Sequence, residues 1–209
     1  MKKIVIAAVC ALTALSLAGC SGNQVQLENV DTTKTLSPDQ IKNGDSDFSN
    51  DLQGLEDYFK KLGYIPHKTK GDDKMMANVI GAKSGRRYVF NVNNSAVAVE
   101  LYEYDPDNLN ADAKRVLEQI QKSDKNEFKV FADERINEGR SYQATVSENG
   151  KFLMIYNDGS ADQKNVSQKK LAENALVSFH SRKATDGSDT EQSKQESTQE
   201  SKQESGVNN

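Results

Sequence analysis

The sequence predicts an α+β fold, in which an antiparallel sheet of two hairpins has helices packed on one face. Apolar and polar residues alternate over residues 88–92 and 97–101, on either side of the turn-forming pair Asn93-Asn94. A second alternation spans residues 142–156 and is interrupted by the turn signal Asn149-Gly150. Elsewhere, apolar residues recur at three- and four-residue steps, which is the spacing of one helix face.

Helices are expected before, between and after these hairpins. Their expected positions are Phe48 to Leu62, Asp73 to Ile80, Leu109 to Ile120, and a closing helix that follows Ser167 and includes Leu171 to Phe179. Gly63 and Pro66 are expected to end the first helix. A short strand is expected from Phe128 to Phe131.

The order of the later elements suggests an internal repeat. A constant shift superposes Tyr88 on Tyr142 and Leu117 on Leu171, in pattern more than in identity. Duplication of a strand-strand-helix (ββα) unit is therefore one interpretation. The prediction of a sheet covered by helices does not depend on it.

The amino-terminal segment has the layout of a bacterial export signal. Lys2 and Lys3 are followed by an uncharged stretch, which is too short to span ~30 Å of hydrocarbon as a stable helix. The stretch ends in Leu17-Ala18-Gly19-Cys20, which resembles the lipobox of bacterial lipoprotein precursors. The resemblance implies a thioether between Cys20 and diacylglycerol, and cleavage between Gly19 and Cys20. The alternatives are an ordinary secretory signal with an incidental cysteine, and an anchor that is not cleaved.

The resemblance also implies a location on the extracytoplasmic side of the cell membrane. Acyl chains such as palmitate contribute ~0.8 kcal/mol for each buried methylene, so two or three of them hold a protein to a bilayer. The lipid bilayer, reached through Cys20, is thus an expected partner. Cys10 lies inside the cleaved signal, so no thiol remains for catalysis, redox chemistry or a disulfide.

Composition changes along the chain divide it into four parts. Residues 1–19 are the expected signal peptide, and the polar residues 20–45 are expected to form a flexible lipid-anchored tether. Val25, Leu27 and Val30 alternate, which offers an edge strand as the alternative. Residues 46–181 have the size of a single α+β domain. Residues 182–209 are rich in Ser, Gln, Glu and Lys, which predicts a disordered tail.

Composition also argues against several classes of function. The formal net charge is −4 and no run of Lys or Arg occurs, whereas nucleic-acid binding requires a concentrated basic face. Two cysteines and two histidines are too few for a zinc framework, and the common nucleotide-binding and hydrolase motifs are missing. The acidic segment 105–112 lacks the glycine and the final acid of a calcium loop, and is expected to be a turn that leads into a helix. We therefore expect no metal and no cofactor.

Tyrosines and arginines at the hairpins are the candidate binding residues. They are Tyr102, Tyr104, Arg86, Arg87 and Arg140. The two tyrosines share the strand face opposite to the apolar face of residues 97–101, and the arginines lie where strands begin. Tyr and Arg are favoured at recognition surfaces because both supply contact area and hydrogen bonds. The alternative is that helices cover this face, so that Tyr102 belongs to the core.

Two classes of function follow from these observations. The first is a non-enzymatic lipoprotein whose domain binds a small ligand or an envelope protein. The second is a small extracytoplasmic hydrolase with a pair of carboxylates drawn from residues such as Asp133, Glu134 and Asp158. The first is favoured, because the region 46–181 contains no thiol, no metal-ligand spacing and no nucleophile motif.

Overall fold

A computed structural model describes residues 26–73, 76–131 and 139–181 of the chain. The expected signal peptide, the cleavage site at Gly19 and Cys20, and the expected tail 182–209 all lie outside these described residues. Asp133 and Glu134 also lie outside them.

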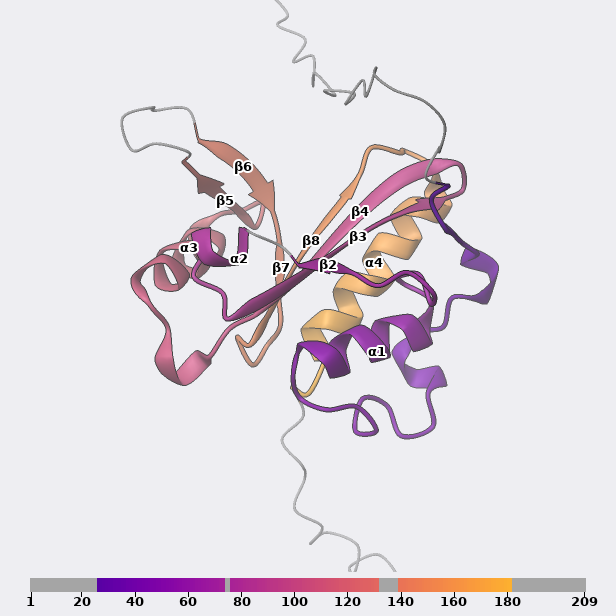
Figure 1. Cartoon of the computed structure of the whole chain (residues 1–209), viewed down its shortest axis with the longest axis horizontal. Coiled ribbons are helices and arrows are strands. Elements are labelled where there is room, and N and C mark those ends of the chain that lie inside the picture. The colour runs from indigo at the N-terminus through magenta and orange to yellow at the C-terminus, as the bar shows by residue number, and fades with distance from the viewer. Residues whose placement is uncertain (1–25, 74–75, 132–138, 182–209) are drawn as a thin grey trace, which may run out of the picture.

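A six-stranded sheet runs through the middle of the domain (Figure 1). Its strand order is β1-β3-β4-β8-β7, and β2 pairs with β3 beside this path. All pairs are antiparallel except β1 with β3, and β5 and β6 form a separate two-stranded sheet. The strands are β1 (Asn29–Val30), β2 (Asp72–Asp73), β3 (Ser84–Val92), β4 (Ser95–Glu103), β5 (Glu127–Val130), β6 (Arg140–Gln143), β7 (Thr145–Val146) and β8 (Phe152–Asp158). The α-helices are α1 (Leu52–Leu62), α2 (Met76–Val79), α3 (Ala111–Lys122) and α4 (Gln163–Ser178), and short 3-10 helices span Thr32–Lys34, Pro38–Gln40 and Pro106–Asn108.

The first hairpin is the longest pairing in the sheet, and its turn is the one expected from the sequence. β3 and β4 pair from Ser84↔Glu103 to Val92↔Ser95. Asn93 and Asn94 have φ values of 45° and 65°, the left-handed conformation that a type I′ turn requires at both central positions. β8 then pairs along the other side of β4, from Val97↔Asp158 to Glu103↔Phe152.

The second hairpin is smaller than the sequence predicts. β7 pairs with β8 at only two positions, Thr145↔Met154 and Val146↔Leu153. The residues just before β7 form β6, which pairs with β5 instead. The structure does not confirm a ββα duplication, because β3 has nine residues and its counterpart in the second hairpin is split between two sheets.

The predicted class, an α+β fold with helices packed on an antiparallel sheet, is confirmed, but helices cover both faces of the sheet rather than one. α1 and α4 pack on the face that carries Val97, Val99 and Leu101. α2 and α3, together with β5 and β6, pack on the opposite face. The reason lies in β4 and β8, which have buried apolar side chains on both sides and therefore need two covering layers.

The helix ends differ by a few residues from those predicted. α1 begins at Leu52 because Asp51 caps it, with Oδ1 accepting from the Gly54 N–H at 2.8 Å, and Gly63 ends it at a φ of 78°. α4 begins at Gln163 after the cap Asp162, so that Ser167 lies within the helix. None of the described helices is both long and apolar enough to cross a membrane.

Residues 26–45 are part of the fold, contrary to the expectation of a flexible tether. β1 pairs with β3, as the alternative interpretation of an edge strand around Val30 predicted. Val30 is buried. Leu36 and Ile41 pack against the same core cluster as α1 and α4. The Tyr64 hydroxyl donates a hydrogen bond to the Leu36 carbonyl at 2.8 Å, which fixes this segment to the end of α1.

We expect removal of this segment to destabilise the domain. A soluble form that begins at Ser46 should unfold with a free energy at least ~2 kcal/mol below that of a form that begins at Ser21, because burial of one aliphatic side chain contributes about that much. Urea unfolding monitored by circular dichroism measures the difference. A form that begins at Ser21 and ends at Ser181 is the control and should match the longer form within ~0.5 kcal/mol. Equal midpoints for the forms starting at Ser21 and Ser46 would show that residues 26–45 contribute no stability.

Candidate functional site

Tyr102 and Tyr104, the aromatic part of the predicted binding site, are core residues. Their exposed fractions are 0% and 1%, and both belong to the cluster covered by α2 and α3. The Tyr102 hydroxyl donates to Glu100 Oε2 at 2.6 Å, and the Tyr104 hydroxyl donates to the Ile80 carbonyl at 3.3 Å. The expectation of a recognition surface here is wrong, because a second layer covers the sheet face that was expected to be open.

The ring of Tyr102 lies over a glycine on the neighbouring strand. Gly85 is paired with Tyr102 across β3 and β4, and a Cβ atom at Gly85 would lie 2.6 Å from the ring. A larger residue at position 85 would therefore displace the tyrosine. Burial raises the pKa of the Tyr102 hydroxyl, and its hydrogen bond to the Glu100 carboxylate raises that pKa further.

The structure does not bring the three candidate arginines together. Arg86 lies on the α1 face, with Nε 3.4 Å from Glu56 Oε1 and a second ion pair to Asp73. Arg87 points to the opposite face, with Nε 3.6 Å from Glu100 Oε1. Arg140 is exposed at the start of β6, in the small sheet. Both arginines of β3 thus neutralise buried glutamates, and the pKa of Glu56 is raised chiefly by burial.

The carboxylates of the alternative, hydrolytic interpretation can be placed only in part. Both carboxylate oxygens of Asp158 accept hydrogen bonds, from Ser95 Oγ at 3.1 Å and from Asn165 Nδ2 at 2.8 Å. Asp158 also accepts from the Ser160 N–H at 2.9 Å, which holds the turn after β8. Within the described residues, no three His, Cys, Asp or Glu side chains gather closely enough to hold a metal ion. The segment after β4 forms the expected turn, and Asn110 caps α3.

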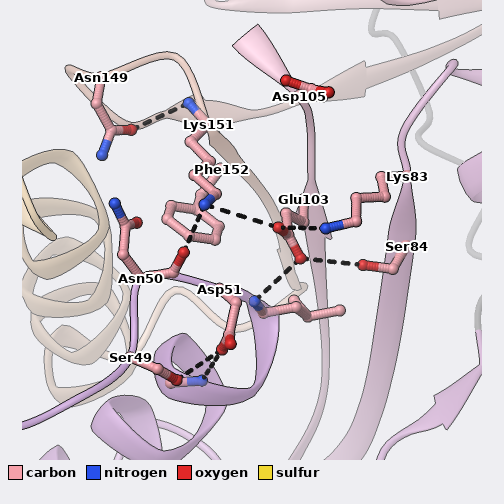
Figure 2. Close-up of polar contacts among 12 residues, drawn as sticks. Ser49, Asn50, Asp51, Lys83, Ser84, Glu103, Asp105, Asn149, Lys151 and Phe152 are labelled. Atoms are coloured by element: carbon pink, nitrogen blue, oxygen red, sulfur yellow. Dashed lines mark hydrogen bonds and ion pairs between the residues drawn. The ribbon is translucent and has the colours of Figure 1, made fainter. Parts of the chain in front are cut away.

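Figure 2 shows a polar cluster that includes the buried carboxylate of Glu103 at the end of β4. Its Oε1 lies 3.2 Å from Lys83 Nζ and 3.8 Å from Lys151 Nζ. Its Oε2 accepts from the Leu52 N–H at 3.2 Å and from Ser84 Oγ at 3.4 Å. The carboxylate therefore joins the first residue of α1 to β3, to β4 and to Lys151, the residue just before β8.

The surroundings of Glu103 indicate a structural role. Lys151 Nζ also donates to the Asn50 carbonyl at 2.5 Å, and Ser49 Oγ donates to Asp51 Oδ1 at 2.7 Å. The hydrogen bond from the Gly54 N–H is the main cause that lowers the pKa of Asp51. Every charged group near Glu103 is thus engaged with main chain or with an opposite charge. Removing one partner of such a buried cluster is costly, because the remaining charge is left without compensation.

A groove of about 310 Å³ lies between α4, the outer edge of β8 and the ends of β5 and β6. Its size is at the lower end of the range for ligand pockets. It combines an apolar floor with a rim of amides, hydroxyls and charges. Its lining residues are Lys125, Asn126, Gln143, Ala144, Thr145, Met154, Tyr156, Lys169, Glu173, Asn174 and Val177.

Tyr156 is the residue that distinguishes this groove from the rest of the surface. It is 5% exposed, and its hydroxyl has no hydrogen-bond partner among the residues that the structure describes. Burial raises the pKa of this hydroxyl, and the carboxylates of Asp158 and Glu173 raise it further, so it remains protonated at neutral pH. A protonated hydroxyl is a hydrogen-bond donor, and a buried donor without an acceptor costs free energy.

The charges of the groove are only loosely paired. Lys169 Nζ lies 3.9 Å from Glu173 Oε1, and about a third of each side chain is exposed. Such a pair contributes little, so either partner can exchange it for a contact with a ligand. Lys125 lies at the exposed turn between α3 and β5 and adds a second ammonium group. The site therefore offers donors and positive charge above an apolar floor.

Sequence reasoning did not find this groove. The pattern of β8 placed Tyr156 in a hairpin, and nothing in the sequence indicated that β7 leaves β8 after two pairs.

The chain was compared with protein-family models, curated proteins and solved structures, and none of them matches it.

The burial of Tyr102 and Tyr104 predicts a large loss of stability when both are truncated. The double variant Tyr102→Ala/Tyr104→Ala should lower the free energy of unfolding by more than ~4 kcal/mol, because each change removes a fully buried aromatic ring and leaves a cavity. Chemical denaturation measures the loss. The control is Phe131→Ala, which truncates a partly exposed ring and should cost less. A loss below ~1 kcal/mol for the double variant would contradict the burial described here.

Proposed function

We propose that the chain is a lipoprotein anchored to the extracytoplasmic side of the cell membrane, and that its domain is a non-enzymatic binding module with the groove at Tyr156 as its ligand site. The anchor is supported by the lipobox-like Leu17-Ala18-Gly19-Cys20 and by the uncharged stretch before it. The binding role is supported by the groove. The single observation that carries it is that Tyr156 lines the groove while its buried hydroxyl has no hydrogen-bond partner among the described residues.

Three other buried tyrosines have an acceptor within the fold: the hydroxyls of Tyr64, Tyr102 and Tyr104 each donate a hydrogen bond. The Tyr88 hydroxyl is also buried without a partner among the described residues, but Tyr88 does not line the groove. Buried polar groups in native proteins are nearly always paired, so one that is left unpaired at a groove is a candidate for ligand contact. A ligand acceptor at Tyr156 would supply the missing bond.

The groove is better suited to binding than to catalysis. Its one carboxylate, Glu173, lies near Lys169, and its other polar side chains are amides, a threonine, a lysine and the tyrosine. General acid–base catalysis by carboxylates needs two such groups with separated pKa values. We therefore do not assign the hydrolytic alternative to this site.

Replacing the lipidated residue tests the anchor. The Cys20→Ser precursor should not be lipidated, because only a thiol forms the thioether, and the protein should be found in the soluble fraction or with its signal uncleaved. Fractionation of cells, high-salt washing of membranes and mass measurement of the mature amino terminus provide the readouts. Full membrane retention of a processed Cys20→Ser protein would disprove the proposed anchor.

Removing the unpartnered hydroxyl tests the binding site. Tyr156→Phe should change the unfolding free energy by less than ~0.5 kcal/mol, because no internal hydrogen bond is lost. The matched control Tyr64→Phe removes a bond to the Leu36 carbonyl and should cost ~1 kcal/mol.

The melting temperatures of the wild-type protein, Tyr156→Phe and Tyr64→Phe are then measured with and without each member of a ligand panel. The panel contains amino acids, dipeptides, sugars and small carboxylates. A ligand at one hundred times its Kd stabilises the folded state by ~2.7 kcal/mol, which is easily detected. We expect at least one class to stabilise the mature protein, and we expect Asn174→Trp, which fills the groove, to abolish that shift. Stabilisation that persists in Asn174→Trp would place the ligand site elsewhere.

A further inference from the structure

β8 loses its outer neighbour halfway along its length. On the side away from β4 it pairs with β7 only at Leu153 and Met154. The chain before Thr145 turns away to form β6, whose last residue, Gln143, pairs with Glu127 of β5. Among the described residues, no strand occupies this edge of β8 beyond Met154. The edge borders the groove, since Met154 and Tyr156 line it.

The register shows which main-chain groups face the open edge. The Ser147 N–H donates to the Phe152 carbonyl at 2.9 Å, so Phe152 turns its main chain toward β7. Because alternate residues of a strand point their main-chain groups to the same side, Met154, Tyr156 and Asp158 do the same. Met154 is opposite Thr145, whereas Tyr156 has no strand partner on this side. Its N–H and C=O therefore have no strand partner on this side among the described residues.

The side chains around this edge are suited to a peptide. Asn126, Gln143 and Asn174 place amide groups at the rim, and an amide both donates to and accepts from a peptide main chain. Met154 and Val177 provide an apolar floor for one side chain. Among the lining residues, Lys125 and Lys169 provide two ammonium groups against the carboxylate of Glu173, which is an excess of positive charge. The nearby Asp158 carboxylate is engaged by Ser95 and Asn165.

We propose that the groove binds an extended, acidic peptide segment of another protein, which adds as a strand to β8 beyond Met154 and places a carboxylate at Lys125 and Lys169. This proposal rests on the proposed function, since it names the ligand class of the same groove. A peptide main chain presents an N–H and a C=O at every second residue on one side, the spacing that the open edge of β8 requires. A sugar or a small carboxylate could form hydrogen bonds with the amides of the rim, but it could not pair with the main chain of β8.

Four peptide probes separate strand addition from simple charge attraction. The first is a fluorescein-labelled heptapeptide that alternates valine and glutamate. The second has lysine in place of every glutamate. The third repeats the first with N-methyl groups on the valines, which removes alternate main-chain donors and keeps the charge. A fourth probe carries the N-methyl groups on the glutamates, because only one of the two sets can face β8. Fluorescence anisotropy with the full mature lipoprotein in detergent micelles measures each affinity.

A pair of charge-reversed variants links binding to the groove. Lys125→Glu/Lys169→Glu should weaken binding of the valine–glutamate peptide at least tenfold, because two attractive contacts become repulsive. The matched control Lys164→Glu/Lys170→Glu reverses the same charge at exposed lysines of α4 that do not line the groove, and should weaken binding less than threefold. Unfolding curves of all four single reversals should coincide with that of the wild type, since the lysines are at the surface.

The proposal is supported if the valine–glutamate peptide binds, the lysine peptide does not, and one of the two N-methylated probes loses at least tenfold in affinity while the other retains it. It is overturned if both N-methylated probes bind as well as the parent, or if the groove and control reversals have equal effects. It is also overturned if the peptide binds a chain that ends at Ser181 but not the full mature chain. That result would mean that the chain's own acidic segment 182–209 occupies the groove. Failure of every peptide, together with a groove-dependent thermal shift from a sugar or small carboxylate, would refute this ligand class and leave the proposed function standing.

Discussion

The pairing of β4 with β3 on one side and β8 on the other is the constraint on which the rest of the structure depends. β4 is paired along its whole length with β3, and from Val97 to Glu103 with β8. Because side chains alternate across a strand, this register sends Val97, Val99 and Leu101 to one core and Tyr102 to the other. A shift by one residue would exchange the two sets, so the two cores fix the register together.

Each face of β4 carries one buried glutamate, and charges from neighbouring elements compensate both. Glu100 has Arg87 and the Tyr102 hydroxyl, and Glu103 has two lysines and the first N–H of α1. Buried ion pairs of this kind contribute little net stability, yet they tolerate few arrangements, since each charge needs its partner. Glu103 thus specifies where α1 begins relative to the sheet.

Local patterns predicted the elements that depend on local chemistry. Asn93-Asn94 predicted its turn, Gly63 predicted the end of α1, and the alternation around them predicted which residues of β3 and β4 share a face. The patterns did not reveal what covers each face. The apolar run of β8 indicated two-sided burial in retrospect, since a strand that is open on one side keeps polar residues there.

The candidate site was missed for a related reason. The groove exists because β7 separates from β8 after two pairs, and that separation is set by the pairing of β6 with β5, not by any residue of the groove itself. The arginines and tyrosines that were predicted as a site are the residue types of recognition surfaces, but buried glutamates engage Arg86 and Arg87, and a second helix layer covers the tyrosines. Composition identified the chemistry of these side chains, whereas tertiary structure decided their surroundings.

The position of β1 limits how far the domain can stand from a membrane. For a chain anchored at Cys20 as proposed, the residues from Cys20 to Asn29 span at most ~30 Å when fully extended, whereas a tether that reached residue 45 would span roughly three times that distance. β1 and β7 are the opposite edges of the main sheet, about 19 Å apart at the usual strand spacing. With that anchor, the domain would be held at low height above the lipid, with its groove on the edge of the sheet across from β1. Only binding partners that come within a few nanometres of the bilayer surface would be in reach.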